Sequence, residues 1–188
     1  MGFFNRIRFH ILKFFKPVMV GRYKRHDGEK LLRTRVSNST AIQGERNLDI
    51  EDNVFIGHFN FIDASNGLKI EEGCQITNYV SILTHSSHIS IRLYGHAYNQ
   101  TEKMIAYGSA PVSIGKFTFV GPHSVIMPGT TIGKGSLISA FSYVKGDFPD
   151  FSIIQGNPAT RIGDTRDLDR TWLEANEELR VYYEEWSK

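Results

Sequence analysis

Residues 112–144 read VSIGKFTFVGPHSVIMPGTTIGKGSLISAFSYV, and a branched aliphatic residue returns at every sixth position of this stretch. These positions are Ile114, Val120, Ile126, Ile132, Ile138 and Val144. A step of six is neither the helical period of about 3.6 residues nor simple strand alternation, so it predicts a repeat architecture. Three hexapeptides would close one triangular coil of about 18 residues, and stacked coils would bury a continuous aliphatic column.

The same spacing continues toward the N-terminus, with three interruptions. It runs through Ile42, Ile50, Ile56, Ile62, Ile70, Ile76 and Ile82. The steps that begin at Ile42 and Ile62 are eight residues long, and the step from Ile82 to Ile114 is 32. Because the three steps begin 20 residues apart, we expect their insertions to stack on one corner of the prism. The longest insertion is the loop 84–111, and loops of that length are usually functional.

Composition is consistent with one soluble domain built on this repeat. The chain has 188 residues, of which 40% are hydrophobic, and a net charge of +2. Its one cysteine excludes a disulfide framework, and Cys74 falls on an inward position of the repeat, so we interpret it as a core residue. The expected fold is an all-β solenoid, a parallel β-helix over residues 36–163, with capping helices at both ends.

Residues 1–35 form a basic segment, with ten Lys and Arg against two acidic residues. Aromatic and aliphatic residues recur at mostly helical spacing up to about Arg25, which predicts an amphipathic helix. Such a helix could cap the open end of the prism or lie on the inner leaflet of a membrane. The segment is too interrupted to span a bilayer and lacks a signal-peptide pattern, so we expect a cytoplasmic protein, in contact with the inner membrane surface if the second interpretation holds. No recognition motif for nucleic acid accompanies the basic residues.

Residues 164–188 are predicted to form one C-terminal helix that acts as a second cap. An apolar stripe that includes Leu168, Trp172 and Leu179 indicates the packed side.

The residues suited to chemistry cluster where the repeat breaks. Thr84-His85-Ser86-Ser87-His88 follows Ile82 directly, and Arg92 lies farther along the long loop. A neutral imidazole at the rim of a loop-walled cleft is a candidate general base. The sequence alone leaves open an equally ordinary alternative, in which His85 only hydrogen-bonds across a corner.

The ordered motifs resemble a known family. The hexapeptides, the His-Ser-Ser-His before a long loop, the stretch 114–121, Met127-Pro128-Gly129 and the closing Gly156-Asn157-Pro158-Ala159 are similar to those of left-handed β-helix acyltransferases. The resemblance covers about residues 36–163 and is greatest to the galactoside, maltose and nodulation-factor acetyltransferases, including sugar O-acetyltransferases of surface-polysaccharide synthesis. It implies a homotrimer with active sites between subunits, acetyl-CoA as donor, and direct transfer to a sugar or glycan hydroxyl with His85 as general base. No metal is expected.

The resemblance also assigns binding residues. On the acceptor side it implies His88 and Arg92, with Asp63 and Asn78 shaping the pocket. On the acetyl-CoA side the matching positions are Phe119, Gly121, Ser139, Ala140, Lys145 and Arg161.

Some positions depart from the family pattern. Pro122 stands where relatives offer a backbone N–H to the thioester oxygen, so that donor must come from elsewhere, and Gly121 is one candidate. The acidic pair of the galactoside enzymes is absent. Two other functions are kept as alternatives, a non-catalytic β-helix that organises a membrane-associated assembly and a γ-class carbonic anhydrase. The second needs three histidines at a spacing that His58, His85 and His88 do not reproduce.

Overall fold

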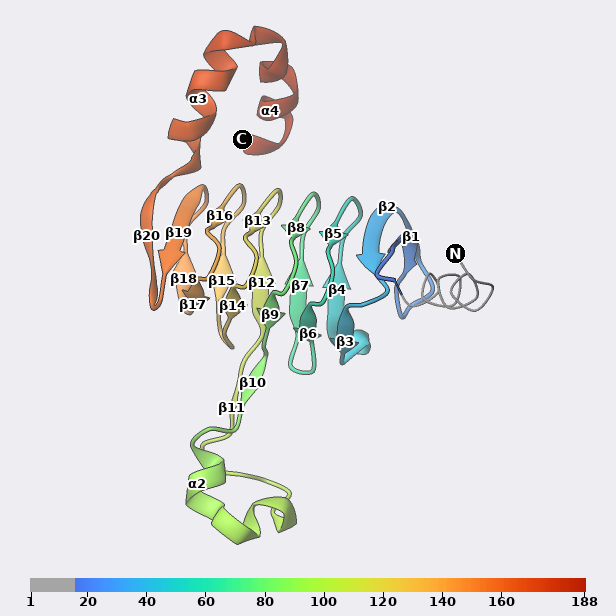
Figure 1. Cartoon of the computed structure of the whole chain (residues 1–188), viewed down its shortest axis with the longest axis vertical. Helices are drawn as coiled ribbons and strands as arrows, with labels where there is room; N and C mark the ends of the chain where they lie inside the picture. The colour runs from blue at the N-terminus through green and yellow to red at the C-terminus, as the bar shows by residue number, and fades with distance from the viewer. Residues whose placement is uncertain (1–15) are drawn as a thin grey trace, which may run out of the picture.

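The structure is a computed structural model and describes residues 16–188. The body is a triangular prism of stacked coils, from which an arm and a helical unit project on opposite sides (Figure 1). The predicted helix at the start of the chain falls mainly on residues 1–15, which lie outside the described residues.

Three sheets of short strands form the faces of the prism, which we name A, B and C. Within each face the coil strands pair in parallel. Face A contains β2 (Lys30–Ser37), β5 (Phe55–Ile56), β8 (Gln75–Ile76), β13 (Phe119–Val120), β16 (Leu137–Ile138) and β19 (Ser152–Gly156). Face B contains β3 (Ala41–Gln43), β6 (Phe61–Asp63), β9 (Ser81–Ile82), β14 (Val125–Ile126) and β17 (Tyr143–Val144). Face C contains β4 (Leu48–Ile50), β7 (Leu68–Ile70), β12 (Val112–Ile114), β15 (Thr131–Ile132) and β18 (Asp147–Phe148). The chain turns from A to B, B to C and C to A at three edges, which we name AB, BC and CA.

The aliphatic column that the six-residue spacing predicts is the core. Every aliphatic residue of the column from Ile50 onward is at most 1% exposed: Ile50, Ile56, Ile62, Ile70, Ile76, Ile82, Ile114, Val120, Ile126, Ile132, Ile138 and Val144. Cys74 is also completely buried, as predicted for a core residue. Burial raises the pKa of its thiol to about 12, so the thiol stays protonated.

Antiparallel strands close face A at both ends. β1 (Met19–Lys24) pairs with β2, and β20 (Ala159–Asp164) pairs with β19. Residues 19–24 are therefore a strand, and the helix predicted up to Arg25 is wrong over this part. The hairpin turns at Asp27-Gly28, where Gly28 has a φ of 93°. Because β2 starts at Lys30 and pairs with β5, the prism begins before residue 36.

The insertions stack on edge BC, as predicted. Ile42, Ile62 and Ile82 are paired in register on face B. The long insertion, residues 84–111, leaves edge BC as an arm whose neck is the two-stranded ladder of β10 (His85–Ser86) and β11 (Gly108–Ser109). Its tip holds α2 (Ser90–Tyr94) and the 3-10 turn η2 (Gly95–Gln100) (Figure 1). A shorter 3-10 turn, η1 (Glu45–Asn47), marks an earlier insertion on the same edge.

The C-terminal segment folds as two helices, not the single helix predicted. α3 (Thr165–Ala175) and α4 (Arg180–Ser187) are separated by η3 (Glu177–Leu179). Trp186 of α4 packs against Phe117 and Phe151 on edge CA, with ring centroids 4.7 and 5.9 Å apart. None of the helices in residues 16–188 is long and apolar enough to cross a bilayer.

Candidate active site

His85 lies at the neck of the arm and is held by a buried carboxylate. Its Nδ1 is 2.7 Å from Asp63 Oδ2, and its backbone pairs with Ser109 across the β10–β11 ladder. Asp63 is the last residue of β6, one coil below the strand that leads into His85. The stacking of two successive corners thus brings together residues 22 positions apart in the chain.

The Asp63 carboxylate is completely buried and surrounded by donors. Oδ2 accepts hydrogen bonds from the Thr84 backbone N–H at 2.9 Å and from the Thr84 hydroxyl at 2.8 Å, and Oδ1 accepts one from the Ser65 N–H at 2.9 Å. Burial raises the pKa of Asp63, but the hydrogen bonds from Ser65 and Thr84 outweigh it and hold the pKa well below its usual range. Asp63 is therefore ionised, and its carboxylate lies on the Nδ1 side of the His85 imidazole. It does not line an acceptor pocket, which corrects the role predicted from sequence.

An ionised carboxylate only accepts hydrogen bonds, so Nδ1 of His85 must carry the proton that it shares with Asp63. The other ring nitrogen, Nε2, is then free to accept a proton. The His85 side chain is 35% exposed, which leaves it accessible to a substrate. Tyr107, on the returning limb of the arm, stacks on the imidazole with centroids 5.7 Å apart and planes 10° apart. The site can thus act as a positioned general base.

His88 and Arg92 lie beyond His85 on the arm. His88 Nδ1 is hydrogen-bonded to the Ser86 hydroxyl at 2.8 Å, and the Arg92 guanidinium donates to the His88 carbonyl oxygen. Both side chains are exposed. The structure therefore keeps these two predicted acceptor residues near His85.

Asn78, the fourth predicted acceptor residue, lies elsewhere. It sits on edge AB, where its side-chain oxygen accepts a hydrogen bond from the His58 N–H at 2.7 Å. Face B separates that edge from His85, so Asn78 does not belong to the His85 pocket of its own chain.

Four of the residues predicted to bind acetyl-CoA lie close together on face A and edge AB: Phe119, Gly121, Ser139 and Ala140. Phe119 is 39% exposed on β13, and Gly121 follows at the corner. A Cβ on Gly121 would lie 2.6 Å from the Ala140 nitrogen and 2.8 Å from the Ser139 carbonyl carbon, so the two coils meet closely there. Lys145 and Arg161 lie apart from this group, on edge BC after β17 and on β20, and Arg161 is paired with Asp164 at 2.9 Å.

Gly121 cannot supply the missing backbone donor beside Pro122. Its N–H donates to the Ile138 carbonyl oxygen at 2.8 Å and is part of the coil ladder. The suggestion that it serves as the oxyanion donor is therefore wrong for this backbone.

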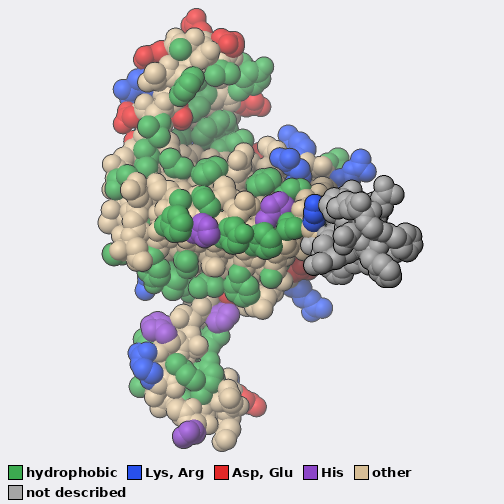
Figure 2. Space-filling model, in the orientation of Figure 1, with side chains coloured by type: hydrophobic (Ala, Val, Ile, Leu, Met, Phe, Trp, Pro, Cys, Tyr) green, Lys and Arg blue, Asp and Glu red, His purple; other side chains and the backbone are tan. Residues whose placement is uncertain are grey.

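Edge AB also carries a ladder of stacked rings, which we name the aromatic ladder: Phe59, Tyr79, His123 and Phe141. Successive centroids are 5.2, 4.8 and 4.8 Å apart, and the planes are nearly parallel. Phe59, Tyr79 and Phe141 are 48%, 50% and 71% exposed. Hydrophobic side chains form a band across the prism between the C-terminal helices and the arm (Figure 2). Such an apolar surface is typical of a protein interface.

No group of three His, Cys, Asp or Glu side chains within residues 16–188 is placed to hold a metal ion.

Comparison with known proteins supports the fold and the repeat. Residues 111–146 match the family model "Bacterial transferase hexapeptide (six repeats)". The chain is 29% identical to the carnitine operon protein CaiE of Proteus over 124 residues, which cover 64% of this chain and 56% of that protein. It spans between a quarter and about three fifths of the length of the first curated relatives it matches.

Two solved structures are similar over most of the chain. A maltose O-acetyltransferase from Clostridium difficile 630 matches with a TM-score of 0.58 and 23% identity, covering 68% of this chain and 64% of that one. AntD, an N-acyltransferase from Bacillus cereus in complex with dTDP and 3-hydroxybutyryl-CoA, matches with a TM-score of 0.58 and 17% identity, covering 88% and 95%. Residues 111–146 thus carry the hexapeptide repeat, and the chain has the left-handed parallel β-helix fold of these transferases, as predicted from its sequence.

Proposed function

We propose that this protein is an O-acetyltransferase that moves an acetyl group from acetyl-CoA to a hydroxyl of a sugar or glycan. The observation that carries the proposal is the hydrogen bond of 2.7 Å between His85 and the buried Asp63, at the neck of an arm on a hexapeptide-repeat prism. Named acyltransferases with the same fold support the reaction class, and one of them is named for a sugar substrate.

The reaction needs one base and no covalent enzyme intermediate. Nε2 of His85 takes the proton of the acceptor hydroxyl as its oxygen attacks the thioester carbonyl, and the C–S bond breaks as the tetrahedral intermediate collapses. The leaving thiolate then receives that proton from the imidazolium, so atoms and charge balance. Asp63 stabilises the imidazolium while it exists, in the manner of a catalytic triad. General base catalysis of this kind contributes about 10²–10⁴-fold.

A backbone donor for the oxyanion is available one coil beyond Pro122. The N–H of Ala140 makes no hydrogen bond within residues 16–188, and Ala140 is exposed beside Gly121. We assign it the stabilisation of the thioester oxygen, a task that depends on preorganised N–H groups.

The two halves of the site lie on different edges of one chain, which supports a homotrimer. His85 is at edge BC, whereas Phe119, Gly121 and Ala140 lie toward edge AB. A face of about five residues spans roughly 16 Å, far more than the contact distance between reacting groups. Packing of edge AB of one copy against edge BC of the next would complete each site and cover the aromatic ladder.

The acceptor would enter between the arm and the neighbouring copy, where His88 and Arg92 offer hydrogen-bond donors. A surface-polysaccharide precursor on the cytoplasmic face of the membrane is consistent with the basic hairpin at the start of the prism. Arg22, Lys24 and Arg35 are exposed there, together with Val20 and Leu32. Cationic surfaces with apolar residues favour anionic lipid.

The proposal is tested by thiol release from acetyl-CoA with a panel of sugars, nucleotide sugars and lipid-linked oligosaccharides, each beside its amino-sugar counterpart. We expect acetyl transfer to a hydroxylated acceptor. Release only with amino sugars would instead identify an N-acyltransferase, and release with no acceptor of the panel would contradict the proposal.

Two variants then test the base. His85→Ala should lower the transfer rate by about 10²-fold or more, with the oligomer intact. His88→Ala is the comparison variant: because His88 is assigned to the acceptor side, it should raise the KM for the acceptor and keep most of kcat. The reverse pattern would assign the base to His88.

A further inference from the structure

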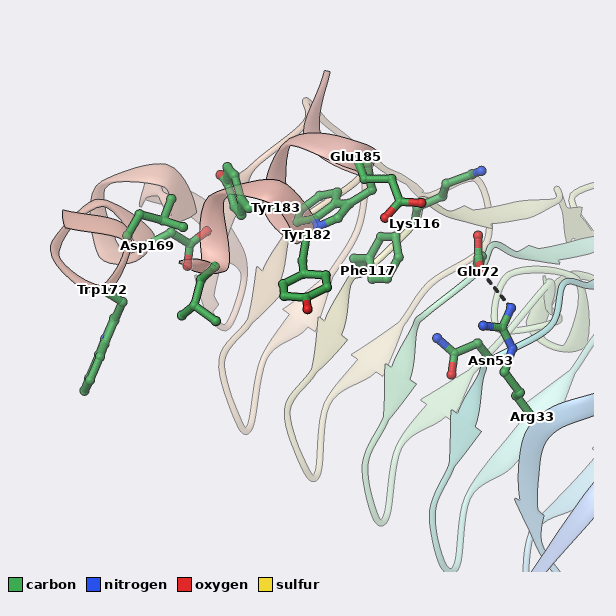
Figure 3. A pocket seen from close by; sticks show the side chains of 13 residues that line it. Arg33, Asn53, Glu72, Lys116, Phe117, Asp169, Trp172, Tyr182, Tyr183 and Glu185 are labelled. Carbon is green, nitrogen blue, oxygen red and sulfur yellow. Dashed lines mark hydrogen bonds and ion pairs between the residues drawn. The ribbon is translucent and has the colours of Figure 1, made fainter. Parts of the chain in front are cut away.

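Ring–ring contacts within residues 16–188 fall in three places, and one of them involves the proposed base. The first is edge AB, which carries the aromatic ladder. In the second, Trp186 contacts Phe117 and Tyr183 on edge CA, beside a cavity of about 800 Å³ next to the C-terminal helices (Figure 3). The third is the pair of Tyr107 and His85 at the neck of the arm. This third contact joins an aromatic ring to a group that must change its charge during the proposed reaction.

The β10–β11 ladder places Tyr107 over the His85 imidazole. His85 is paired with Ser109 across this antiparallel ladder, and Tyr107 comes two residues before Ser109. Side chains two residues apart on a strand lie on the same side, so Tyr107 is the diagonal neighbour of His85. The ring centroids are 5.7 Å apart and the ring planes 10° apart. This separation and near-parallel arrangement are those of an offset stack.

The turn before Tyr107 also fixes its position. Ala106 has a φ of 61°, in the left-handed region that non-glycine residues rarely adopt, and it is the only non-glycine residue of the arm that does so. The backbone N–H of Ile105 donates to the Tyr94 hydroxyl at 2.9 Å, which ties the turn to α2. A conformation of this kind persists where surrounding contacts impose it, often at functional sites. Tyr107 is thus held by the turn on one side and by the ladder on the other.

Two groups act on different parts of the imidazole. Asp63 is hydrogen-bonded to Nδ1 at the ring edge, and Tyr107 covers a ring face, which leaves Nε2 without a hydrogen-bond partner in the part of the chain that the structure describes. His88, on the same limb of the arm, is instead bonded to the Ser86 hydroxyl. Burial raises the pKa of Tyr107, and the nearby Tyr98 and Asp63 raise it further, so the phenol stays neutral. The effect of Tyr107 on the imidazole therefore comes from its ring and not from a phenolate charge.

We propose that Tyr107 is a positioning residue that stabilises the imidazolium form of His85 through the face of its aromatic ring. Ring faces carry partial negative charge and attract cations that lie within about 6 Å of the ring centroid. The imidazole becomes positive only when Nε2 takes the acceptor proton, so this attraction acts in the transition state and not on the resting enzyme. An interaction of that kind raises kcat rather than the affinity for substrate. The inference rests on the proposed function, because it needs His85 as the base.

Three replacements of Tyr107 separate the ring face from the rest of the side chain. Tyr107→Phe keeps the ring and should keep kcat within about 2-fold of the native value. Tyr107→Leu fills similar space without a ring, and should lower kcat by about 2- to 30-fold with a nearly unchanged KM for the acceptor. In the third, 3,4,5-trifluorophenylalanine replaces Tyr107 and keeps the shape of the ring, while its fluorine atoms withdraw negative charge from the ring face. Its kcat should be at least about 2-fold below that of Tyr107→Phe.

Rates are measured as thiol release from acetyl-CoA with the acceptor that the panel identifies, on protein that keeps the native oligomer mass. Tyr98→Leu changes another tyrosine of the arm, in η2, whose ring does not stack on His85, and as the matched control it should keep the native kcat. A purely structural role of Tyr107 would not distinguish the trifluorinated ring from Phe. Equal kcat for these two, or a change in KM alone for Tyr107→Leu, would overturn the inference while leaving acetyl transfer in place. A native protein that transfers acetyl to no acceptor would overturn the proposed function, and this inference with it.

Discussion

Replacement of Asp63 by Asn is the sharpest test of the proposed base. Both carboxylate oxygens accept hydrogen bonds, Oδ1 from Ser65 and Oδ2 from Thr84 and His85. The amide NH₂ of Asn must therefore face a donor in either orientation. If it faces Ser65, the amide oxygen still accepts from His85 but carries no charge. If it faces His85, the imidazole must take the other tautomer, and Nε2 can no longer accept a proton.

The size of the effect follows from these two orientations. A hydrogen bond to a charged group contributes about 1.5–3 kcal/mol. Losing that contribution to the imidazolium in the transition state lowers kcat by about 10- to 150-fold, at 1.36 kcal/mol per factor of ten. The wrong tautomer would lower it further, by up to about 10⁴-fold. We therefore expect a loss of at least about 10-fold.

The assay is thiol release from acetyl-CoA with the acceptor that the panel identifies, measured as kcat and KM across pH. For Asp63→Asn we expect a lower kcat and a nearly unchanged KM for the acceptor. Asp147→Asn, an exposed carboxylate on β18, is the control and should behave as the native protein. An Asp63→Asn protein that is folded and keeps its native kcat, or that changes only the KM for the acceptor, would refute the role given to Asp63.

Four further outcomes are expected. Cys74, whose thiol pKa burial raises to about 12, should not react with a thiol reagent at pH 8 until the protein unfolds, and fast labelling of folded protein would contradict its burial. Gly121→Ala places a Cβ 2.6 Å from backbone atoms of the next coil and should lower the free energy of unfolding by about 1–3 kcal/mol in urea titrations, whereas Gly21→Ala, with open space around it, should change it little. Tyr79→Glu, in the middle of the aromatic ladder, should dissociate the oligomer in sedimentation experiments, and an unchanged mass would exclude the ladder from the interface. Because the folded state depresses the pKa of Asp63, the stability it provides is present above the ordinary pKa of about 3.9 and is lost as pH falls below it, so acid titrations of Asp63→Asn should show a flatter loss of stability than the native protein.

The sequence predicted the coil accurately because its determinants are local and periodic. Each hexapeptide carries its own inward aliphatic residue, and the interruptions at Ile42, Ile62 and Ile82 share one register. The hairpin before the prism also had a local signal, Asp27-Gly28, but the aromatic and basic pattern ahead of it was interpreted as a continuous helix. The break between α3 and α4 begins at Asn176, a residue with low helix propensity. The break was missed because the apolar residues on both sides of Asn176 were interpreted as one continuous helical stripe.

The partner of His85 was harder to predict. Asp63 was identified as a functional residue, but its role depends on side-chain direction at a corner, which residue spacing alone does not give. The signal that could have found it is the 20-residue repeat itself, because Asp63 follows Ile62 as Leu83 follows Ile82, so Asp63 lies directly below the exit to the arm. The contact of Tyr107 with His85 could not be predicted from the sequence, because it depends on how the arm returns to the prism. The oxyanion donor likewise required the backbone hydrogen bonds of Gly121 and Ala140.

The arm begins and ends at one corner without disturbing the coil on either side of it. Leu68 pairs with Val112 and Ile70 with Ile114, so face C continues across the insertion as if residues 84–111 were not there. Lengthening or replacing such an insertion carries little cost in the stability of the prism, since loop closure entropy grows slowly with length. Acceptor preference could therefore diverge by exchange of the part of the arm beyond the β10–β11 neck, while His85, Asp63 and the acyl-donor surface are inherited unchanged.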